Sequence, residues 1–161
     1  MSTSSLWEYA HSFSPAPPSK RMVIKLSVTD LSTTTPFYQH LLNLEPTLQT
    51  AERIEFETDD PAVRIILMQS TNHKSCAGHY GFQMKSTRFI EQTRFRLLEK
   101  GFRITNEDNV ACCYAGQTKL WVADPEGNRW EFFVTTVTEV SEGCGPDCIC
   151  HQQLDRTLLS A

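Results

Sequence analysis

The sequence contains no run of about 18 apolar residues, the length that a membrane-spanning helix requires, so we expect no membrane segment. Its first 20 residues also lack the apolar core of a secretory signal peptide and are rich in serine and proline instead. We therefore predict that residues 1–20 form a mobile tail and that the protein is cytoplasmic.

Strong charge of one sign is absent as well. The chain of 161 residues carries a formal net charge of −4, so it lacks the basic footprint of a nucleic-acid-binding protein. No secretion signal accompanies its six cysteines, which favours reduced thiols over a disulfide framework. The length and a hydrophobic content of 40% are those of one ordinary globular domain with its own core.

One pattern of secondary structure occurs twice along the chain. In each half a strand is followed by an amphipathic helix and then by further strands, so each half reads β-α-β-β-β. This pattern predicts an α+β domain over 21–138, in which modules at about 22–70 and 78–138 form a curved mixed sheet around a cleft. The predicted strands are 23–28, 53–57, 63–68, 79–84, 102–105, 112–114, 119–122 and 129–134.

Local signals mark the helix ends and one loop. Asp30 or Ser32 is expected to cap the first helix, which Asn43 ends, and Pro36 is expected within about its first turn. The polar run 106–109 predicts a flexible loop.

The two halves can be aligned through their first strands. Val28 and Met84 both end such a strand just before a helix cap, and Val23 and His79 lie five residues before them. Val23 is therefore the predicted pseudo-symmetric mate of His79.

Two features indicate a binding site. Glu131 lies among large apolar residues after the tight turn 124–127, and a buried carboxylate is costly unless it is paired or bound to a metal. Cys112 and Cys113 supply two soft donors that suit a soft metal or metalloid. Because consecutive side chains of a flat strand point to opposite faces, the two thiols can hold one atom only from a loop, a bulge or a strand end.

The duplication, the stretch 78–83 and the run 124–131 resemble the vicinal oxygen chelate superfamily, which includes glyoxalase I, extradiol dioxygenases and bleomycin-resistance proteins. Within it, the segment 112–121 looks much closer to the branch of organoarsenical C–As lyases and cadmium-induced proteins. This resemblance implies a non-haem Fe(II)- and O₂-dependent enzyme that cleaves the carbon–arsenic bond of trivalent organoarsenicals.

The resemblance also implies roles for individual residues. The metal ligands would come from the positions of Val23, His79 and Glu131, of which the last two match. Arsenic and the rest of the substrate would be held by Cys112, Cys113, Tyr114, Gln117 and Lys119.

Val23 departs from the branch, because a valine cannot donate to a metal. A third ligand could come from His11, His40, a thiolate, water or a partner chain, and the metal could be absent or a divalent ion other than Fe(II). Lys25 shares a strand face with Val23, so its ammonium could pair with Glu131 in place of a metal. Another alternative is that His79 makes a core hydrogen bond while Glu131 pairs with an arginine.

A rival reading is a non-catalytic protein that sequesters arsenicals or cadmium through its thiols. It draws further support from the tail 139–161, where Cys144, Cys148 and Cys150 could capture a soft metal ion. Dimerisation is common for this fold, so a homodimer is a candidate assembly.

Overall fold

The computed structural model describes residues 19–71, 78–112 and 115–138 of the chain. Within these ranges it confirms two successive β-α-β-β-β modules. The first module contains β1 (Met22–Val28), α1 (Leu31–Leu42), β2 (Leu48–Gln49), β3 (Arg53–Asp59) and β4 (Ala62–Gln69). The second contains β5 (His79–Gln83), α2 (Thr87–Glu99), β6 (Ile104–Cys112), β7 (Ala115–Ala123) and β8 (Arg129–Val137).

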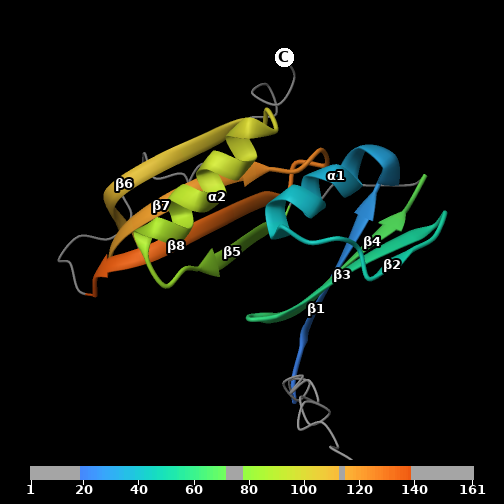
Figure 1. The fold of residues 1–161 in the computed structure, drawn as a ribbon, viewed down its shortest axis with the longest axis horizontal. Helices are drawn as coiled ribbons and strands as arrows, with labels where there is room; N and C mark the ends of the chain where they lie inside the picture. The colour runs from blue at the N-terminus through green and yellow to red at the C-terminus, as the bar shows by residue number, and fades with distance from the viewer. Residues whose placement is uncertain (1–18, 72–77, 113–114, 139–161) are drawn as a thin grey trace, which may run out of the picture.

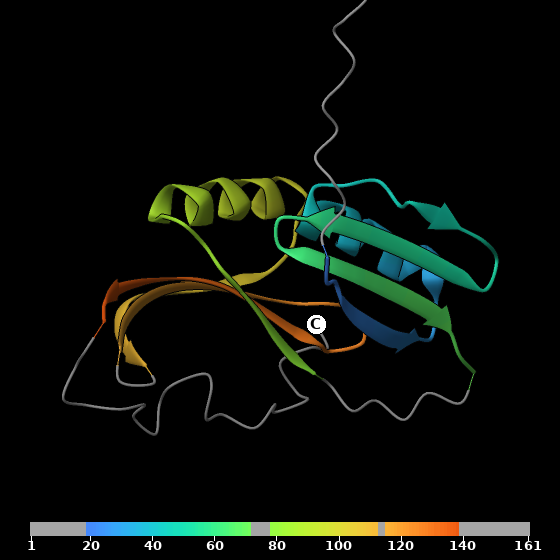
Figure 2. The ribbon, with the colours of Figure 1, turned by 90° about the horizontal axis from the view of Figure 1, so that it is seen from below.

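Each module forms its own four-stranded mixed sheet, which confirms the α+β fold. The strand orders are β1-β4-β3-β2 and β5-β8-β7-β6, so the first strand of each module lies at an edge, parallel to the last strand. Figure 1 shows α2 lying across the second sheet, and Figure 2 shows the two sheets as separate groups of strands. The described residues contain no helix long and apolar enough to cross a bilayer.

The structure confirms the predicted ends of the first helix but not the predicted position of its proline. Asp30 is the N-cap, and its Oδ1 accepts a hydrogen bond of 2.7 Å from the Ser32 amide. Asn43 ends the helix in the left-handed conformation at φ 56°. The placement of Pro36 was wrong, because it lies inside α1 beyond the first turn.

The predicted loop at 106–109 was also wrong. These residues belong to β6, which joins the two short strands predicted at 102–105 and 112–114. The ladder to β7 shifts register between Glu107 and Val110, and Asn109 adopts a φ of 53° there. A bulge of this kind lets polar residues interrupt the alternation without ending the strand.

The alternation of side chains gives the second sheet two different faces. Leu120, Val122, Trp130 and Phe132 point to the face covered by α2 and join the same core as Leu97 of that helix. Fully burying each such side chain contributes about 1.5–3 kcal/mol. The odd-numbered neighbours on β5, β7 and β8 therefore point away from α2, and they include the predicted site residues.

A buried carboxylate joins the two modules. Asp124, in the turn before β8, accepts hydrogen bonds from the Tyr38 hydroxyl of α1 at 2.7 Å and from the Asn128 amide at 2.7 Å. Trp130 donates from Nε1 to the same hydroxyl oxygen at 3.3 Å. Burial, aided by the charge of Asp124, raises the pKa of Tyr38 far above its usual value, so the hydroxyl stays protonated and donates.

We expect Tyr38→Phe to lower the free energy of unfolding by about 1–3 kcal/mol, because it leaves Trp130 Nε1 without its acceptor and removes one of the hydrogen bonds that Asp124 accepts inside the core. Urea denaturation followed by tryptophan fluorescence measures the change. A denaturation midpoint equal to that of the unmodified protein would show that this junction adds no stability.

Candidate functional site

The predicted ligands His79 and Glu131 meet on the face of the second sheet that points away from α2. They lie on the neighbouring strands β5 and β8, where Gly81 is opposite Glu131 and His79 is opposite Arg129. The distance from His79 Nε2 to Glu131 Oε1 is 3.3 Å. Residues 52 positions apart in the sequence are thus joined by one parallel ladder.

Gly81 makes room for this approach. A Cβ atom added at Gly81 would lie 2.8 Å from both Cγ and Oε1 of Glu131, a distance that real Cβ atoms essentially never show. The missing side chain therefore allows the glutamate to lie across β5 and reach the imidazole.

Lys119 of β7 approaches the other oxygen of the same carboxylate. Its Nζ lies 3.4 Å from Glu131 Oε2, and the lysine side chain is only 4% exposed. Oε2 is buried and makes no hydrogen bond among the described residues. The approach of Lys119 Nζ is therefore a contact between charges rather than a hydrogen bond.

This contact corrects two alternatives drawn from the sequence. The cation beside Oε2 is Lys119, not an arginine, and within the described ranges Lys25 makes no ion pair with Glu131. Lys119 and Gln117, which the resemblance assigns to the substrate, are both buried. Sequence periodicity places Lys119 and Trp121 on one face of a strand, but it does not show that β8 lies beside them.

Trp121 packs against two side chains of the site, His79 and Lys119. Its ring centroid lies 4.9 Å from that of His79 and 5.5 Å from Lys119 Nζ. Its Nε1 donates a hydrogen bond of 2.8 Å to Glu107 on β6. Trp121 is only 4% exposed, so the ring acts as a packing surface for these residues.

The donors fit part of a divalent metal site. Two ligands bound to one ion at about 2.1 Å and at right angles stand about 3.0 Å apart, close to the 3.3 Å between Nε2 and Oε1. Imidazole and carboxylate suit Fe(II), Mn(II) or Zn(II). Among the described residues no three His, Cys, Asp or Glu side chains gather, so this part of the chain would supply two protein ligands to such an ion.

The first module supplies no donor at the corresponding positions. Val23 pairs with Arg64 in its parallel ladder as His79 pairs with Arg129, which supports the alignment of the two halves. Two residues beyond each arginine come Ile66 and Glu131, so the mate of the carboxylate is also apolar.

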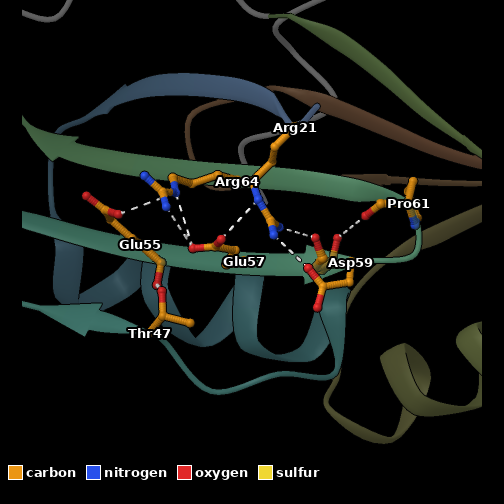
Figure 3. Close-up of polar contacts among 8 residues, drawn as sticks. Arg21, Thr47, Glu55, Glu57, Asp59, Pro61 and Arg64 are labelled. Carbon is orange, nitrogen blue, oxygen red and sulfur yellow. Dashed lines mark hydrogen bonds and ion pairs between the residues drawn. The ribbon is translucent and has the colours of Figure 1, made fainter. Parts of the chain in front are cut away.

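The corresponding face of the first module carries paired charges instead. Figure 3 shows Glu57 between two arginines, with Arg21 Nε at 2.9 Å and an Arg64 guanidinium nitrogen at 3.0 Å. Arg21 Nη2 also lies 2.6 Å from Asp59 Oδ1. These groups satisfy one another, so among the described residues only the second module brings a histidine and a carboxylate together on this face.

The structure tests the thiol site only in part. Cys112 is the last residue of β6, which agrees with the requirement for a strand end, and its backbone pairs with Ala115. Lys119 lies four residue steps along β7 from Ala115, about 13 Å of strand, so the Cys112 backbone does not adjoin the His79–Glu131 pair. Predicted residues outside the described ranges are His11, Cys113, Tyr114, Cys144, Cys148 and Cys150.

His40 does not join the site. It lies in α1, where its ring packs against Phe102 at a centroid distance of 6.0 Å and its carbonyl accepts a hydrogen bond from Arg96. This helix covers the apolar side of the sheets, so its imidazole is not a third ligand within the described part of the chain.

We expect Gly81→Ala to weaken the binding of Co(II), a spectroscopic probe of His–carboxylate sites, by about tenfold or more, a loss of about 1.4 kcal/mol or more. The added methyl group would force Glu131 Oε1 away from His79 Nε2. Titration followed by the visible absorption of Co(II) measures the dissociation constant.

Gly116→Ala is the matched control, because it adds a methyl group to β7 of the same sheet next to Val137 rather than Glu131. Its Co(II) affinity should stay at the unmodified value. Equal affinities in both variants would show that the approach of Glu131 to His79 is not needed for binding.

Comparison with known proteins agrees with this fold. The chain is 33% identical over 129 residues to a trivalent organoarsenical cleaving enzyme of Bacillus sp. (strain MD1), covering 79% of this chain and 80% of that protein. It is 30% identical over 126 residues to the cadmium-induced protein CadI of Mycobacterium tuberculosis, covering 78% and 83% of the two chains.

A lactoylglutathione lyase from Agrobacterium tumefaciens shares the fold, with a TM-score of 0.57 and 19% identity over 73% of this chain and 95% of that one. The model of one protein family matches residues 22–132, which span both modules and include His79 and Glu131. The chain belongs to the Glyoxalase/Bleomycin resistance protein/Dioxygenase superfamily.

Proposed function

We propose that this protein cleaves the carbon–arsenic bond of trivalent organoarsenicals in a reaction that uses Fe(II) and O₂. The observation that carries the proposal is the pair of unlike donors at 3.3 Å, His79 Nε2 and Glu131 Oε1, in a chain about 30% identical to organoarsenical cleaving enzymes. An imidazole and a half-buried carboxylate at this separation are suited to hold a divalent ion.

In this proposal the residues have separate roles. His79 and Glu131 hold the metal, and Fe(II) bound there would supply the site at which O₂ is reduced. Cys112 and Cys113 bind arsenic, because thiolates match the softness of As(III). Trp121 keeps water away from one side of the imidazole, against which it packs.

The overall reaction balances without an external reductant. Methylarsonous acid, CH₃As(OH)₂, plus O₂ gives arsenous acid, As(OH)₃, plus formaldehyde, CH₂O. Arsenic stays trivalent, while the carbon gives up as many electrons as O₂ accepts, and the C–As bond is replaced by C–O and As–O bonds. The site therefore needs only one arsenical, one molecule of O₂ and Fe(II).

We expect protein loaded with Fe(II) in air to convert methylarsonous acid to arsenite, and Glu131→Gln to abolish this turnover because it removes the anionic ligand. Separation of arsenic species by chromatography with elemental detection measures both. Glu57→Gln, which removes a carboxylate from the paired charges of the first module, is the control and should keep full activity.

A second candidate is thiol-based sequestration of arsenicals or cadmium without turnover. The apolar residues Val23 and Ile66 at the mates of His79 and Glu131 favour it. The distance of about 13 Å of strand between Ala115, the backbone partner of Cys112, and Lys119 favours it too. Arsenical binding by the metal-free protein, with no arsenite produced after Fe(II) is added, would replace the first candidate by this one.

Under both candidates we expect Cys112→Ser and Cys113→Ser each to weaken binding of a trivalent organoarsenical by at least about tenfold, because a hydroxyl is a poor ligand for a soft centre. Calorimetric titration under anaerobic conditions with a reductant gives the dissociation constants. Cys76→Ser, outside the pair, is the control. Undiminished affinity in both variants would show that Cys112 and Cys113 do not bind the arsenical.

A further inference from the structure

We propose that Lys119 is a positioning residue that holds Glu131 Oε2 and so leaves only Oε1 to bind the metal beside His79. The inference rests on the metal site of the proposed function, and it assigns that site a coordination mode. A carboxylate can bind a metal through one oxygen or through both, and a cation held against one oxygen decides between these modes.

The two oxygens of Glu131 have different neighbours. Oε1 lies 3.3 Å from His79 Nε2, and Oε2 lies 3.4 Å from Lys119 Nζ. Oε2 is buried and accepts no hydrogen bond among the described residues, so the lysine charge is its nearest compensation there. The carboxylate is therefore polarised by two different groups on two different strands, β5 and β7.

Lys119 is itself held in place. Only 4% of its side chain is exposed, and the ammonium lies 5.5 Å from the centroid of the Trp121 ring, a cation–π distance. That ring is fixed in turn by its hydrogen bond to Glu107. A side chain packed in this way cannot swing out to solvent as a surface lysine can, so the charge beside Oε2 is a permanent part of the site.

The contact of Lys119 with Glu131 Oε2, called the clamp below, affects how the carboxylate can coordinate a metal. With Oε2 held, the described residues occupy one coordination position through His79 and one through Glu131, and the remaining positions stay open to small molecules. Freed from Lys119, the carboxylate could rotate to bind through both oxygens or lose its alignment with the imidazole. Outer-sphere partners of metal ligands typically change affinity by about 10- to 100-fold when removed.

The test compares Lys119→Met, which removes both charge and donor, with Lys119→Gln, which keeps a hydrogen-bond donor. Lys25→Met, an exposed lysine of β1, is the control for loss of one positive charge. Each protein, with the full chain intact, is titrated anaerobically with Co(II). Infrared difference spectra with ¹³C-labelled glutamate then report the splitting of the carboxylate stretches, which distinguishes one-oxygen from two-oxygen binding.

We expect Lys119→Met to bind Co(II) about 10- to 100-fold more weakly and to lose the one-oxygen signature, with partial recovery of both in Lys119→Gln. Lys25→Met should match the unmodified protein. If Lys119→Met fails to fold, Lys119→Gln decides alone through the infrared signature. Co(II) binding in Lys119→Met that is as tight as or tighter than normal would overturn the clamp, because the lysine would then be a competitor of the metal or irrelevant to it.

The same experiment gives a different result if the metal site itself is absent. An unmodified protein that does not bind Co(II) would overturn both the clamp and the iron-dependent reaction. Normal binding with an unchanged signature in both Lys119 variants would overturn the clamp alone and leave the proposed function standing.

Discussion

The placement of the site depends on one buried carboxylate, Asp124. Its oxygens accept hydrogen bonds from the Tyr38 hydroxyl at 2.7 Å and from the backbone and side-chain amides of Asn128 at 2.7 and 2.8 Å. Asn128 in turn accepts from the Gly78 amide at 2.8 Å. This chain of bonds ties α1 of the first module to the starts of β5 and β8, and therefore fixes the ladder in which His79 and Glu131 meet. A buried polar network of this kind stabilises only when each member has its partner, so it specifies one arrangement.

The same ladder explains how a duplicated fold produces a one-sided site. Both modules place their first strand parallel to their last, so each brings two positions together: Val23 and Ile66 in one, His79 and Glu131 in the other. The backbone frame is common to both, and only side-chain chemistry distinguishes them. In the first module the neighbouring strand positions hold charges such as Glu57 and Arg64 that neutralise each other. The fold thus permits such a pair of donors in either half, and among the described residues only the second module carries it.

How much the sequence revealed differs between features with a local cause and features with a distant one. The modules, the Asp30 cap and the mate of His79 follow from strand and helix periods and from capping residues, which act over a few positions. The contact of Lys119 with Glu131 could not be predicted from the sequence, because it depends on the neighbouring placement of strands β8 and β7. The prediction of a loop at 106–109 was wrong for a related reason. The ladder to the distant strand β7 keeps these polar residues in β6 through a bulge.

Electrostatics links these observations. Glu131 brings one negative charge to a partly buried face, and desolvation makes that charge costly unless cations approach both oxygens. Packing holds Lys119 beside one oxygen, whereas the other oxygen faces the ring of His79, so Oε1 is the side open to an added cation. A divalent ion next to Oε1 would complete the compensation without moving a strand, because Gly81 already leaves the space. The buried lysine and the missing side chain of Gly81 therefore serve one arrangement, in which a single carboxylate oxygen faces a single imidazole nitrogen.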